Sequence, residues 1–476
     1  MIVLYTNIGL SRRTGTEVLV ADLARAVKAE GHQPMVYARS AGQVADEIAA
    51  LGIPVETDLH RLPATPDVIH GHHHLETIEA IQRFPMTPAL FVCHDVNAWH
   101  DQVPRHPNIR RFVAVGLNAR RRLLRDWLRT WGRIEVIGNG VDEARFLPRS
   151  ALPVVPRRAL VFSNDAGDGS HWEPTAEACA RAGISVDRVG WAAGRQVAAP
   201  ESILQDYDLV FAKGRCALEA AAVGAAVILC DIHGLGRMIT SQTVAHLYAW
   251  NFGMQTHSRP VRVDSILAEI RRYDPQDAEK VRDFIRGHAT LSQAVDRYLA
   301  VYRRIRAEGV PAVLPASRRT LYPKTRRLEQ SDQAGLKIEI QECPAEARIG
   351  SWIVLRVKLR SQIDAPVATS PPCHTLFFHR WYEANSDLAL PAETPRGIIQ
   401  PPLNPGKVEK YTIRLLAPRK AGRFRIRITL LQEGWRWLDE LDPRVFADRW
   451  ITVHDELPAS QDAPAWPRLG RRGEVG

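Results

Sequence analysis

The period at which apolar residues recur, and the point where that period changes, most constrains how this chain can fold. Up to about residue 309, short apolar runs alternate with longer stretches whose apolar residues recur every three or four positions. The first such stretch places Val20, Leu23, Ala24 and Val27 on one helical face. From residue 336 the period falls to two, as in WIVLRVKLR and FRIRITLL. The pattern therefore predicts strands that alternate with helices, followed by a separate all-β region.

The strand-like runs fall into two groups, and we expect each group to form one parallel sheet. Strands separated by helices pair through crossover connections, and ligands of such sheets bind beyond the carboxyl ends of the strands. A proline-bearing segment, FLPRSALPVVPRR, separates the groups and is typical of a linker. The first group comprises 2–6, 34–38, 68–70, 89–93, 112–115 and 134–137, and the second comprises 159–162, 188–191, 208–212 and 226–230.

The predicted fold class is α/β, with two Rossmann-like domains followed by an antiparallel β-sandwich. Helices of the second domain are expected at 173–182 and 217–223, with one long helical stretch at 278–307. The cleft between two such domains is the default ligand site. The predicted regions are an N-terminal domain at 1–150, a second α/β domain at 156–309, a basic linker at 310–335, the sandwich at 336–455 and a disordered tail at 456–476.

Composition and charge narrow the class of protein. Six cysteines lie singly, without metal-type spacing, and several fall in apolar runs, which is typical of reduced residues in the cytoplasm. No apolar run approaches the roughly 20 residues that cross a bilayer, and the N-terminal apolar stretch precedes its arginines, unlike a signal peptide. The net charge of +10 fits nucleic acid, an anionic membrane or phosphorylated small molecules. Because no nucleic-acid module is recognisable, we expect no nucleic acid as a partner.

Three segments of the first 300 residues carry distinctive motifs. They are TGTEVLVADLARAV, the pair RFVAVGLNARRRLLRD and IEVIGNGVDEARFLPR, and YDLVFAKGRCALEAAAVGAAVILCD. In this order they resemble the GT-B glycosyltransferases of family 4. The resemblance implies two facing Rossmann-like domains, a nucleotide-diphosphate sugar held mainly by the second, and transfer with retention at the anomeric carbon.

The third segment gives the resemblance its donor-binding residues. Glu219 stands where the family has a glutamate that binds the ribose hydroxyls, and a carboxylate can accept two such donors. Alternatively, it interacts only with the dipole of its helix. The family's first glutamate, eight positions earlier, is replaced here by Phe211. This departure puts catalysis in doubt.

A departing diphosphate needs cations or a helix N-terminus. The first strand of the second domain leads to Ser163 and Asn164, where the family usually has a Gly-Arg and Lys pair. Lys213 and Arg215, just past a strand end, are expected to supply that charge instead, or else to be solvated loop charges. The predicted donor-binding residues are Ser163, Asn164, Lys213, Arg215 and Glu219.

The first domain is expected to serve the acceptor and the reacting centre. Gly15 allows a close approach of the backbone at a helix N-terminus, although an ordinary turn capped by Thr16 has the same sequence. His94 ends a buried run, where a neutral imidazole can donate to a sugar hydroxyl, or where it is simply a core histidine. The predicted catalytic residues are His94 and Asp95, and the predicted acceptor-side residues are Gly15, Thr16, His72 and Asn139.

Two further features have open interpretations. The histidines at 70, 72, 73 and 74 lack carboxylate or cysteine companions at familiar spacing, so we expect no metal and no cofactor beyond the nucleotide sugar as co-substrate. Residues 118–131 combine a Leu/Trp stripe with arginines on another face. Such a helix either lies on an anionic membrane or packs its stripe on the sheet.

The C-terminal segments HTLFFHRWYEANSD, PGKVEKYTIRLLAP and GRFRIRITLLQEGWRWLDE resemble an accessory Ig-like module of bacterial polysaccharide-assembly proteins. Trp381, Trp435 and Trp437 could stack on sugar rings or pack in its core. The sequence thus predicts a cytoplasmic glycosyltransferase of bacterial surface polysaccharide synthesis, acting on a glycan or lipid-linked acceptor, with peripheral contact to the inner membrane face as a further expectation. The alternatives are a non-catalytic GT-B-derived glycan-binding or scaffold protein and a basic nucleic-acid enzyme.

Overall fold

A computed structural model gives the structure of residues 1–96, 98–126, 133–310, 323, 325–333, 335–370, 373–390, 396–418, 420–432, 436–441 and 445–455. These residues belong to two compact units. The first comprises 1–325 with 369–372, and the second comprises 326–368 with the residues from 373 onward. Most of the predicted linker, the predicted tail and residues 127–131 of the Leu/Trp stretch lie outside the described residues.

The first unit begins with a seven-stranded parallel sheet in the order β3-β2-β1-β4-β5-β6-β7. Chain order reverses between β1 and β4, which pair directly. The central strands are buried on both faces, which explains their continuous apolar sequences. The strands are β1 (Ile2–Asn7), β2 (Gln33–Ala38), β3 (Val55–Glu56), β4 (Val68–His72), β5 (Ala89–Cys93), β6 (Ile109–Ala114) and β7 (Ile134–Val136).

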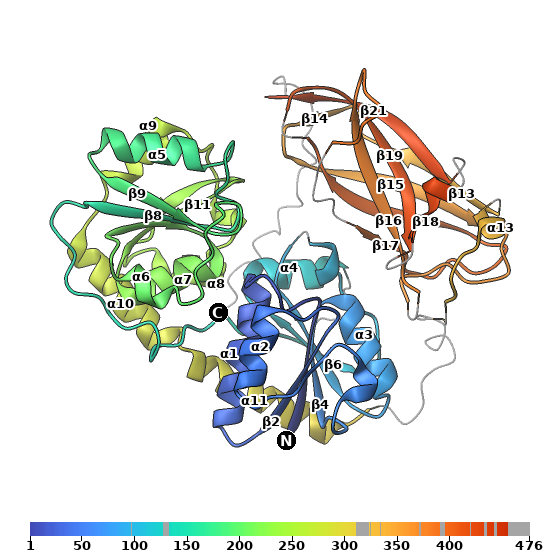
Figure 1. Cartoon of the computed structure of the whole chain (residues 1–476), viewed down its shortest axis with the longest axis horizontal. Helices are drawn as coiled ribbons and strands as arrows, with labels where there is room; N and C mark the ends of the chain where they lie inside the picture. Colours follow the sequence, from blue (N-terminus) through green and yellow to red (C-terminus); the bar gives the residue numbers. More distant parts are fainter. Residues whose placement is uncertain are drawn as a thin grey trace, which may run out of the picture. The chain divides into compact units, whose positions relative to one another are not determined.

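Helices cover both faces of this sheet, with α1 and α2 on one side and α3 on the other (Figure 1). Helix α1 carries the predicted stripe, in which Val20, Leu23, Ala24 and Val27 are fully buried. Because the helices connect strands that pair in parallel, the loops after the strands gather at one edge of the sheet. The helices are α1 (Gly15–Ala29), α2 (Gln43–Ala50), α3 (His74–Arg83) and α4 (Leu117–Asp126).

A second sheet of five strands follows in the order β12-β11-β10-β8-β9. It is parallel except for the edge strand β12, which pairs antiparallel with β11. The strands are β8 (Arg158–Phe162), β9 (Ser185–Val189), β10 (Leu209–Ala212), β11 (Ala226–Asp231) and β12 (Gly234–Met238). The helices are α5 (Trp172–Arg181), α6 (Glu201–Leu204), α7 (Gly214–Val223), α8 (Val244–Ala249), α9 (Val263–Ile270) and α10 (Pro275–His288).

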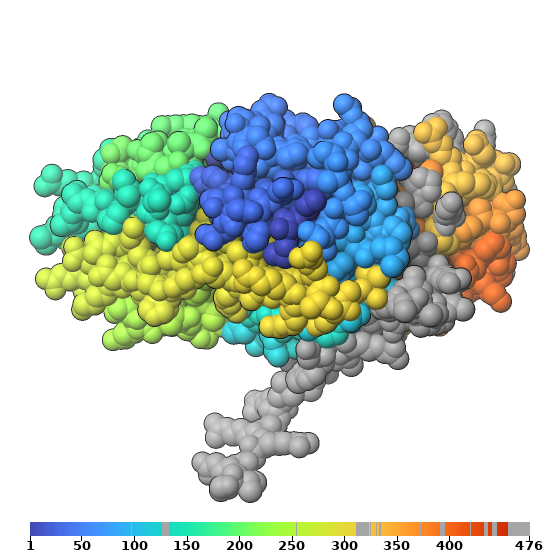
Figure 2. Space-filling model, turned by 90° about the horizontal axis from the view of Figure 1, so that it is seen from below, coloured from blue at the N-terminus to red at the C-terminus, as the bar shows by residue number. Residues whose placement is uncertain are grey.

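Two sequence expectations in this region were wrong in detail. The single helix expected at 278–307 is two helices, because Thr290 caps a new helix, α11 (Leu291–Glu308), through a capping box with Gln293. The strand expected at 188–191 is β9, which ends at Val189 and leaves Trp191 half exposed. Helix α11 packs into the core of the first sheet, although it follows the second in sequence. In Figure 2 the yellow segment of α10 and α11 accordingly lies along both the blue and the green parts of this unit.

The second unit contains two sheets around one apolar core. Alternate residues of each long strand point into this core, as in Trp352–Ser361, where Ile353, Leu355, Val357 and Leu359 are buried. All strand pairs are antiparallel except β14 with β21, which fits the predicted β-sandwich. One sheet contains β13 (Leu336–Glu342), β15 (Trp352–Ser361) and β18 (Val408–Leu416), and the other contains β14 (Glu346–Arg348), β16 (Thr375–Glu383), β17 (Gly397–Ile398), β19 (Gly422–Gln432), β20 (Arg436–Trp437) and β21 (Phe446–His454).

The tryptophans considered for sugar stacking have different surroundings. Trp381 is buried in the core and its Nε1 donates to the carbonyl of Leu416 at 3.1 Å. Trp437 lies edge-on to Phe378, with the Arg380 guanidinium 4.5 Å from its ring. Trp435 is outside the described residues. The core interpretation therefore holds for Trp381.

The two α/β sheets and the antiparallel sheets confirm the predicted fold class. All six cysteines lie in the described part of the chain, and none forms a disulfide. Among the described helices, none is both long and apolar enough to cross a membrane.

Candidate functional site

Two neighbouring cavities lie where the loops after the strands of the first unit gather. The larger one has a volume of about 320 Å³ and the smaller one about 100 Å³. Residues from both sheets line each of them. The larger cavity brings together seven of the predicted site residues, namely Gly15, His94, Asp95, Ser163, Asn164, Lys213 and Arg215. Glu219 lines the smaller cavity, together with Gly15, Asn164 and Arg215.

The turn from β10 to α7 shapes the larger cavity. Strand β10 ends at Ala212 and α7 begins at Gly214, so Lys213 alone joins them. Gly214 has a φ of 54°, which glycine adopts without strain, and no side chain caps the helix. Gly214, Arg215 and Cys216 all line the cavity. Gly214 donates its own N–H to the carbonyl of Phe252 at 3.0 Å, so the backbone N–H groups that the first turn of α7 can offer to an anion there are those of Arg215 and Cys216.

The same turn shows what the Phe211 replacement means. Phe211 is fully buried and packs in the core of the second sheet with Val161 and Ile228, away from both cavities. No acidic residue occurs between Ala212 and Glu219. The acid that the family resemblance leads one to expect near the sugar is therefore missing from this turn.

Lys213 keeps its positive charge through a buried acid. Its Nζ lies 2.6 Å from Oδ2 of Asp231 and 3.6 Å from Asp165. Burial alone would lower the pKa of Lys213, but the charges of Asp231 and Asp165 outweigh it and raise that pKa. Burial alone would raise the pKa of Asp231, but the hydrogen bond from His257 and the charge of Lys213 hold it well below its usual range. Lys213 is thus a fixed cation at the cavity.

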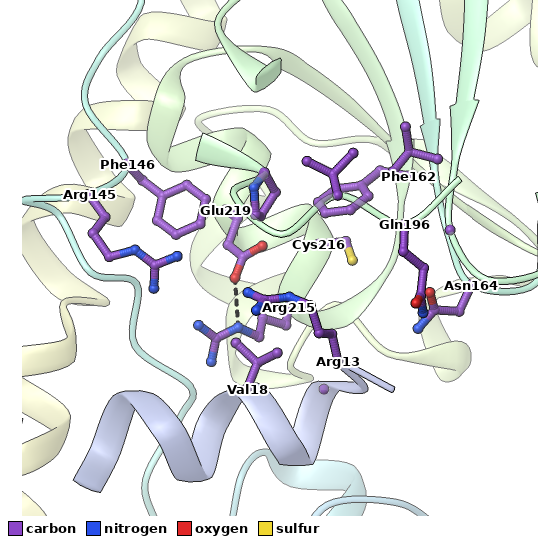
Figure 3. Close-up of a pocket in the computed structure, with 15 residues that line it drawn as sticks. Arg13, Val18, Arg145, Phe146, Phe162, Asn164, Gln196, Arg215, Cys216 and Glu219 are labelled. Carbon is purple, nitrogen blue, oxygen red and sulfur yellow. Dashed lines mark hydrogen bonds and ion pairs between the residues drawn. The ribbon is translucent and has the colours of Figure 1, made fainter. Parts of the chain in front are cut away.

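Arg215 joins Glu219 to the first sheet's helix α1. Its Nε lies 2.6 Å from Oε1 of Glu219, and its Nη2 contacts Asp22 of α1. Asp22, only 3% exposed, also contacts Arg25 at 3.0 Å and Arg145 at 3.1 Å. The remaining nitrogen, Nη1 of Arg215, is buried without a partner. Figure 3 shows the bond between Glu219 and Arg215 at the smaller cavity.

Glu219 is therefore already hydrogen-bonded in this structure. Burial raises the pKa of its carboxyl, and the charge of Arg215 opposes that rise. One carboxylate oxygen, Oε1, is taken by Arg215. Around it, the smaller cavity has an apolar wall with a few polar side chains, a combination typical of small-molecule sites. The apolar residues are Val18, Phe146, Phe162, Val189, Val197 and Pro200, and the polar ones include Arg13, Arg145, Asn164 and Gln196.

His94 enters the larger cavity from the end of β5. The backbone N–H groups of His94 and Asp95 both donate to Oδ2 of the buried Asp101, at 2.9 and 2.5 Å. Nε2 of His94 lies 2.7 Å from Nδ1 of His72. Burial lowers the pKa of His94, although Asp101 opposes this. His94 is therefore a neutral imidazole at neutral pH, held by its backbone and by His72.

Three predicted acceptor-side residues do not line the larger cavity. His72 is fully buried behind His94. Thr16 lies inside the first turn of α1, whose N-cap is Thr14, so the alternative of a turn capped by Thr16 was wrong. Asn139 contacts the cavity only through Asn251. Its Nδ2 donates at 3.0 Å to Oδ1 of Asn251, which lines the cavity.

Sequence reasoning missed several lining residues. Asn118 at the start of α4 and the loop at 250–253 reach the larger cavity, and Asn251 has a φ of 54°. No pattern marks this loop in the sequence, since it follows a short helix of mixed composition. Glu17 was visible in the TGTE motif, and the structure gives it a role: it accepts a hydrogen bond from the backbone N–H of Arg12 at 2.7 Å. Glu17 thereby shapes the loop that precedes Gly15.

The arginines of α4 mostly contact protein. Arg122 is buried and donates to the carbonyl of Asp95 at 2.9 Å. The guanidinium of Arg121 lies 4.3 Å from the centre of the Trp250 ring. Leu123 is fully buried against the sheet. The described part of this stretch therefore packs on the protein, while contact with a membrane stays a prediction.

Among the described residues, one group of side chains lies close enough to share a metal ion: His73, His100 and Asp101. The hydrogen bonds of His73 do not fit this use. Its Nδ1 accepts from the backbone N–H of Ile8 at 3.1 Å, so in the neutral ring the proton is on Nε2. A ligating histidine instead has its other ring nitrogen as a donor. His73 is therefore poorly suited to bind a metal here, and the proposed function does not use one.

The sequence and the structure were compared with known proteins. Residues 13–145 match the family model described as Glycosyltransferase Family 4. No curated protein sequence matches the chain. A glycosyltransferase from Rickettsia africae is similar in structure, with 14% identity, a TM-score of 0.46, and coverage of 64% of this chain and 98% of that chain. The Anabaena protein Alr3699/HepE, in complex with UDP and glucose, has 13% identity, a TM-score of 0.44, and coverage of 63% of this chain and 99% of that chain.

A shorter part of the chain is similar to a further solved structure. The CARDB domain of a Pyrococcus furiosus protein has 16% identity and a TM-score of 0.18, covering 26% of this chain and 96% of that chain. The family-model match confirms the predicted resemblance to family 4 over residues 13–145. Together with the two Rossmann-like sheets, it supports a nucleotide-sugar glycosyltransferase.

Proposed function

We propose that this protein transfers a sugar, with retention, from a nucleotide-diphosphate sugar to a glycan or lipid-linked acceptor, in bacterial surface polysaccharide synthesis. The observation that carries the proposal is the pairing of a fixed cation with a helix N-terminus. Lys213 and the first turn of α7 lie together at the larger cavity, which His94 enters from the other sheet.

The leaving diphosphate is the group that this arrangement suits best. Negative charge builds up on it as the bond to the sugar breaks, and preorganised donors and cations stabilise that charge. Lys213 supplies a full charge, while the amides at the start of α7 supply a partial one. Ser163 and Asn164 line the same cavity and add polar groups beside them.

The nucleoside of the donor would then bind in the smaller cavity. Its apolar wall, with Phe146 and Phe162, suits a flat ring. Glu219 keeps one carboxylate oxygen for ribose hydroxyls while Arg215 holds the other. Because Gly15, Asn164 and Arg215 line both cavities, one extended ligand can occupy the two together.

The acceptor would be bound by His94 and Asp95, which directly follow β5 of the first sheet. A neutral imidazole there can hydrogen-bond a sugar hydroxyl and position it for transfer. No metal or further cofactor is part of the proposal. Retention is tested by NMR of the product, whose new linkage keeps the donor's anomeric configuration.

The central test is a thermal-shift panel of UDP-, GDP- and ADP-sugars on the full chain. A ligand at a hundred times its Kd stabilises by about 2.7 kcal/mol, which raises Tm by several degrees. Lys213→Ala should lose this ligand-induced shift, while Lys280→Ala, on the exposed face of α10, should keep it. The shift on adding ligand is compared, because Lys213→Ala also leaves Asp231 without its cation.

The missing acid of the β10–α7 turn favours a second candidate, a non-catalytic GT-B-derived protein that binds glycan or scaffolds polysaccharide assembly. In that protein Arg215 and Glu219 would serve each other and the fold. The absence of a shift with every sugar in the panel would favour this candidate. A shift without turnover on any acceptor glycan would favour it as well.

A further inference from the structure

The contact between His72 and His94 determines more than the position of His94. The two rings come from neighbouring parallel strands, β4 and β5, with ring planes 16° apart and centroids 4.9 Å apart. Nδ1 of His72 and Nε2 of His94 are 2.7 Å apart, which is a hydrogen bond. One of these two nitrogens must therefore carry the proton.

Both rings are neutral, so each carries one proton. Burial lowers the pKa of His72 well below its usual value, and the neighbouring histidines at 70, 94 and 73 lower it further. Burial has the same effect on the pKa of His94. In a neutral imidazole, one nitrogen donates and the other accepts. The assignment of the shared proton therefore fixes both tautomers.

The surroundings of His72 decide which nitrogen that is. Its other ring nitrogen, Nε2, is buried and has no hydrogen-bond partner in the part of the chain that the structure describes. A proton there would be a buried N–H without a partner among the described residues, and this costs more than a bare acceptor in the same place. The proton of His72 is accordingly on Nδ1, and Nδ1–H donates to Nε2 of His94.

The consequence falls on the ring that lines the cavity. Since Nε2 of His94 accepts, the proton of that neutral ring is on Nδ1. We propose that His72 is a positioning residue that fixes His94 as the Nδ1–H tautomer. His94 then offers the larger cavity a hydrogen-bond donor for a ligand oxygen, such as a sugar hydroxyl or a phosphate oxygen, and does not act as a base. The choice of ligand rests on the proposed function, whereas the tautomer does not.

His70 supports this arrangement from the other side. Its ring stacks on that of His72 with centroids 4.6 Å apart and planes 16° apart. Its own Nδ1 is 2.5 Å from the hydroxyl of Tyr302, so it makes no competing bond to His72 or His94. His70 therefore packs against the His72 ring, and the hydrogen bond from His72 to His94 has a fixed direction.

The test is long-range 1H–15N NMR of the full chain labelled on histidine, without ligand, which distinguishes protonated from bare ring nitrogens. The His94 signals are assigned by their loss in His94→Gln. We expect a protonated Nδ1 and a bare Nε2 in His94 of the wild type. A proton on Nε2 of His94 would overturn the proposal.

Variants separate positioning from packing. His72→Leu removes the donor, so His94 should lose its uniform Nδ1–H state, and His72→Gln, which can still donate through its amide, should restore it. His70→Leu is the matched control, because it removes a buried histidine of the same strand and its stacking contact but leaves the Nδ1 donor of His72. Equal effects of His70→Leu and His72→Leu would overturn the proposal. A chain that shows the expected tautomer but binds no nucleotide sugar would refute only the proposed function.

Discussion

Asp22→Asn tests whether the charge network between α1 and α7 exists as described. Asp22 contacts the guanidinium groups of Arg25, Arg145 and Arg215, and it is nearly inaccessible to solvent. Asparagine has almost the same shape, so the substitution leaves no cavity and removes only the charge. Arg215, with 9% of its side chain exposed, would then be a buried cation with Glu219 as its one remaining acid.

The loss in the free energy of unfolding depends on which of the three arginines still has an acidic partner after the substitution. Removing one partner of a buried ion pair costs about 3–5 kcal/mol. Arg145 keeps Glu201 at 3.0 Å, and Arg25 keeps Asp142 at 2.6 Å. The loss therefore falls mainly on Arg215, which points to the lower end, about 3 kcal/mol. For a unit of this size, that lowers Tm by about 4 °C.

The assay is calorimetric unfolding of the full chain, in which the transition of the first unit should move. Asp283→Asn is the matched control: Asp283 contacts Arg282 at 2.9 Å with 67% of its side chain exposed, so it should shift stability by at most about 0.5 kcal/mol. Added salt should change the difference little, because a buried network is weakly screened. If both variants lower Tm equally, the network does not hold α1 to α7, and the account of Arg215 is wrong.

Two other substitutions test the surroundings of the cavities. Burial lowers the pKa of His171 to about 4, so its protonation destabilises the fold, and stability is lost as pH falls from 6.5 towards 4, by roughly 3 kcal/mol in total. His171→Leu should therefore gain stability relative to wild type between pH 7.5 and 4.5 in urea unfolding, and a constant difference would contradict this assignment. Phe211→Glu would restore the family's acid but place a carboxylate in the core, so we expect Tm to fall by more than 10 °C or folding to fail. A stable Phe211→Glu protein with raised transferase activity would show that the side chain faces the cavity.

The sequence predicted both parallel sheets because their strands are buried on both faces and read as continuous apolar runs. It missed β12, whose Gly-Leu-Gly sequence has little strand preference and which forms by pairing with β11. The sequence pattern also predicted one helix in place of α10 and α11, although Thr290 and Gln293 have the residue types and spacing of a capping box. A helix boundary is easily missed when the helical periodicity of apolar residues continues on both sides of it.

The site was predictable to the extent that it depends on topology. Lys213 and His94 follow strands, and the ends of parallel strands meet at one edge, so their proximity could be expected. The pairing of Arg215 with Asp22 could not, because it joins positions 193 apart and depends on how α1 and α7 pack. The bond between Arg215 and Glu219 is different, because it joins residues four apart in α7, a spacing that the sequence itself shows.

The acids at the cavities could compete with a ligand for Lys213 and Arg215, or they could hold these two cations in place for it. The two possibilities predict opposite effects on ligand binding when an acid is removed. Lys213 has three N–H donors and gives one to Asp231, so it can contact an anion without leaving that acid. Asp22 and Glu219 hold Arg215 beside both cavities, with its Nη1 buried and without a partner among the described residues. Asp22→Asn should then weaken binding of a nucleotide-diphosphate sugar by about tenfold, or about 1.4 kcal/mol, because Arg215 becomes free to move. Calorimetric titration at a temperature where the variant is folded measures this. Tighter binding by Asp22→Asn would mean that the acid competes with the ligand, and that Arg215 must leave Asp22 before the diphosphate can bind.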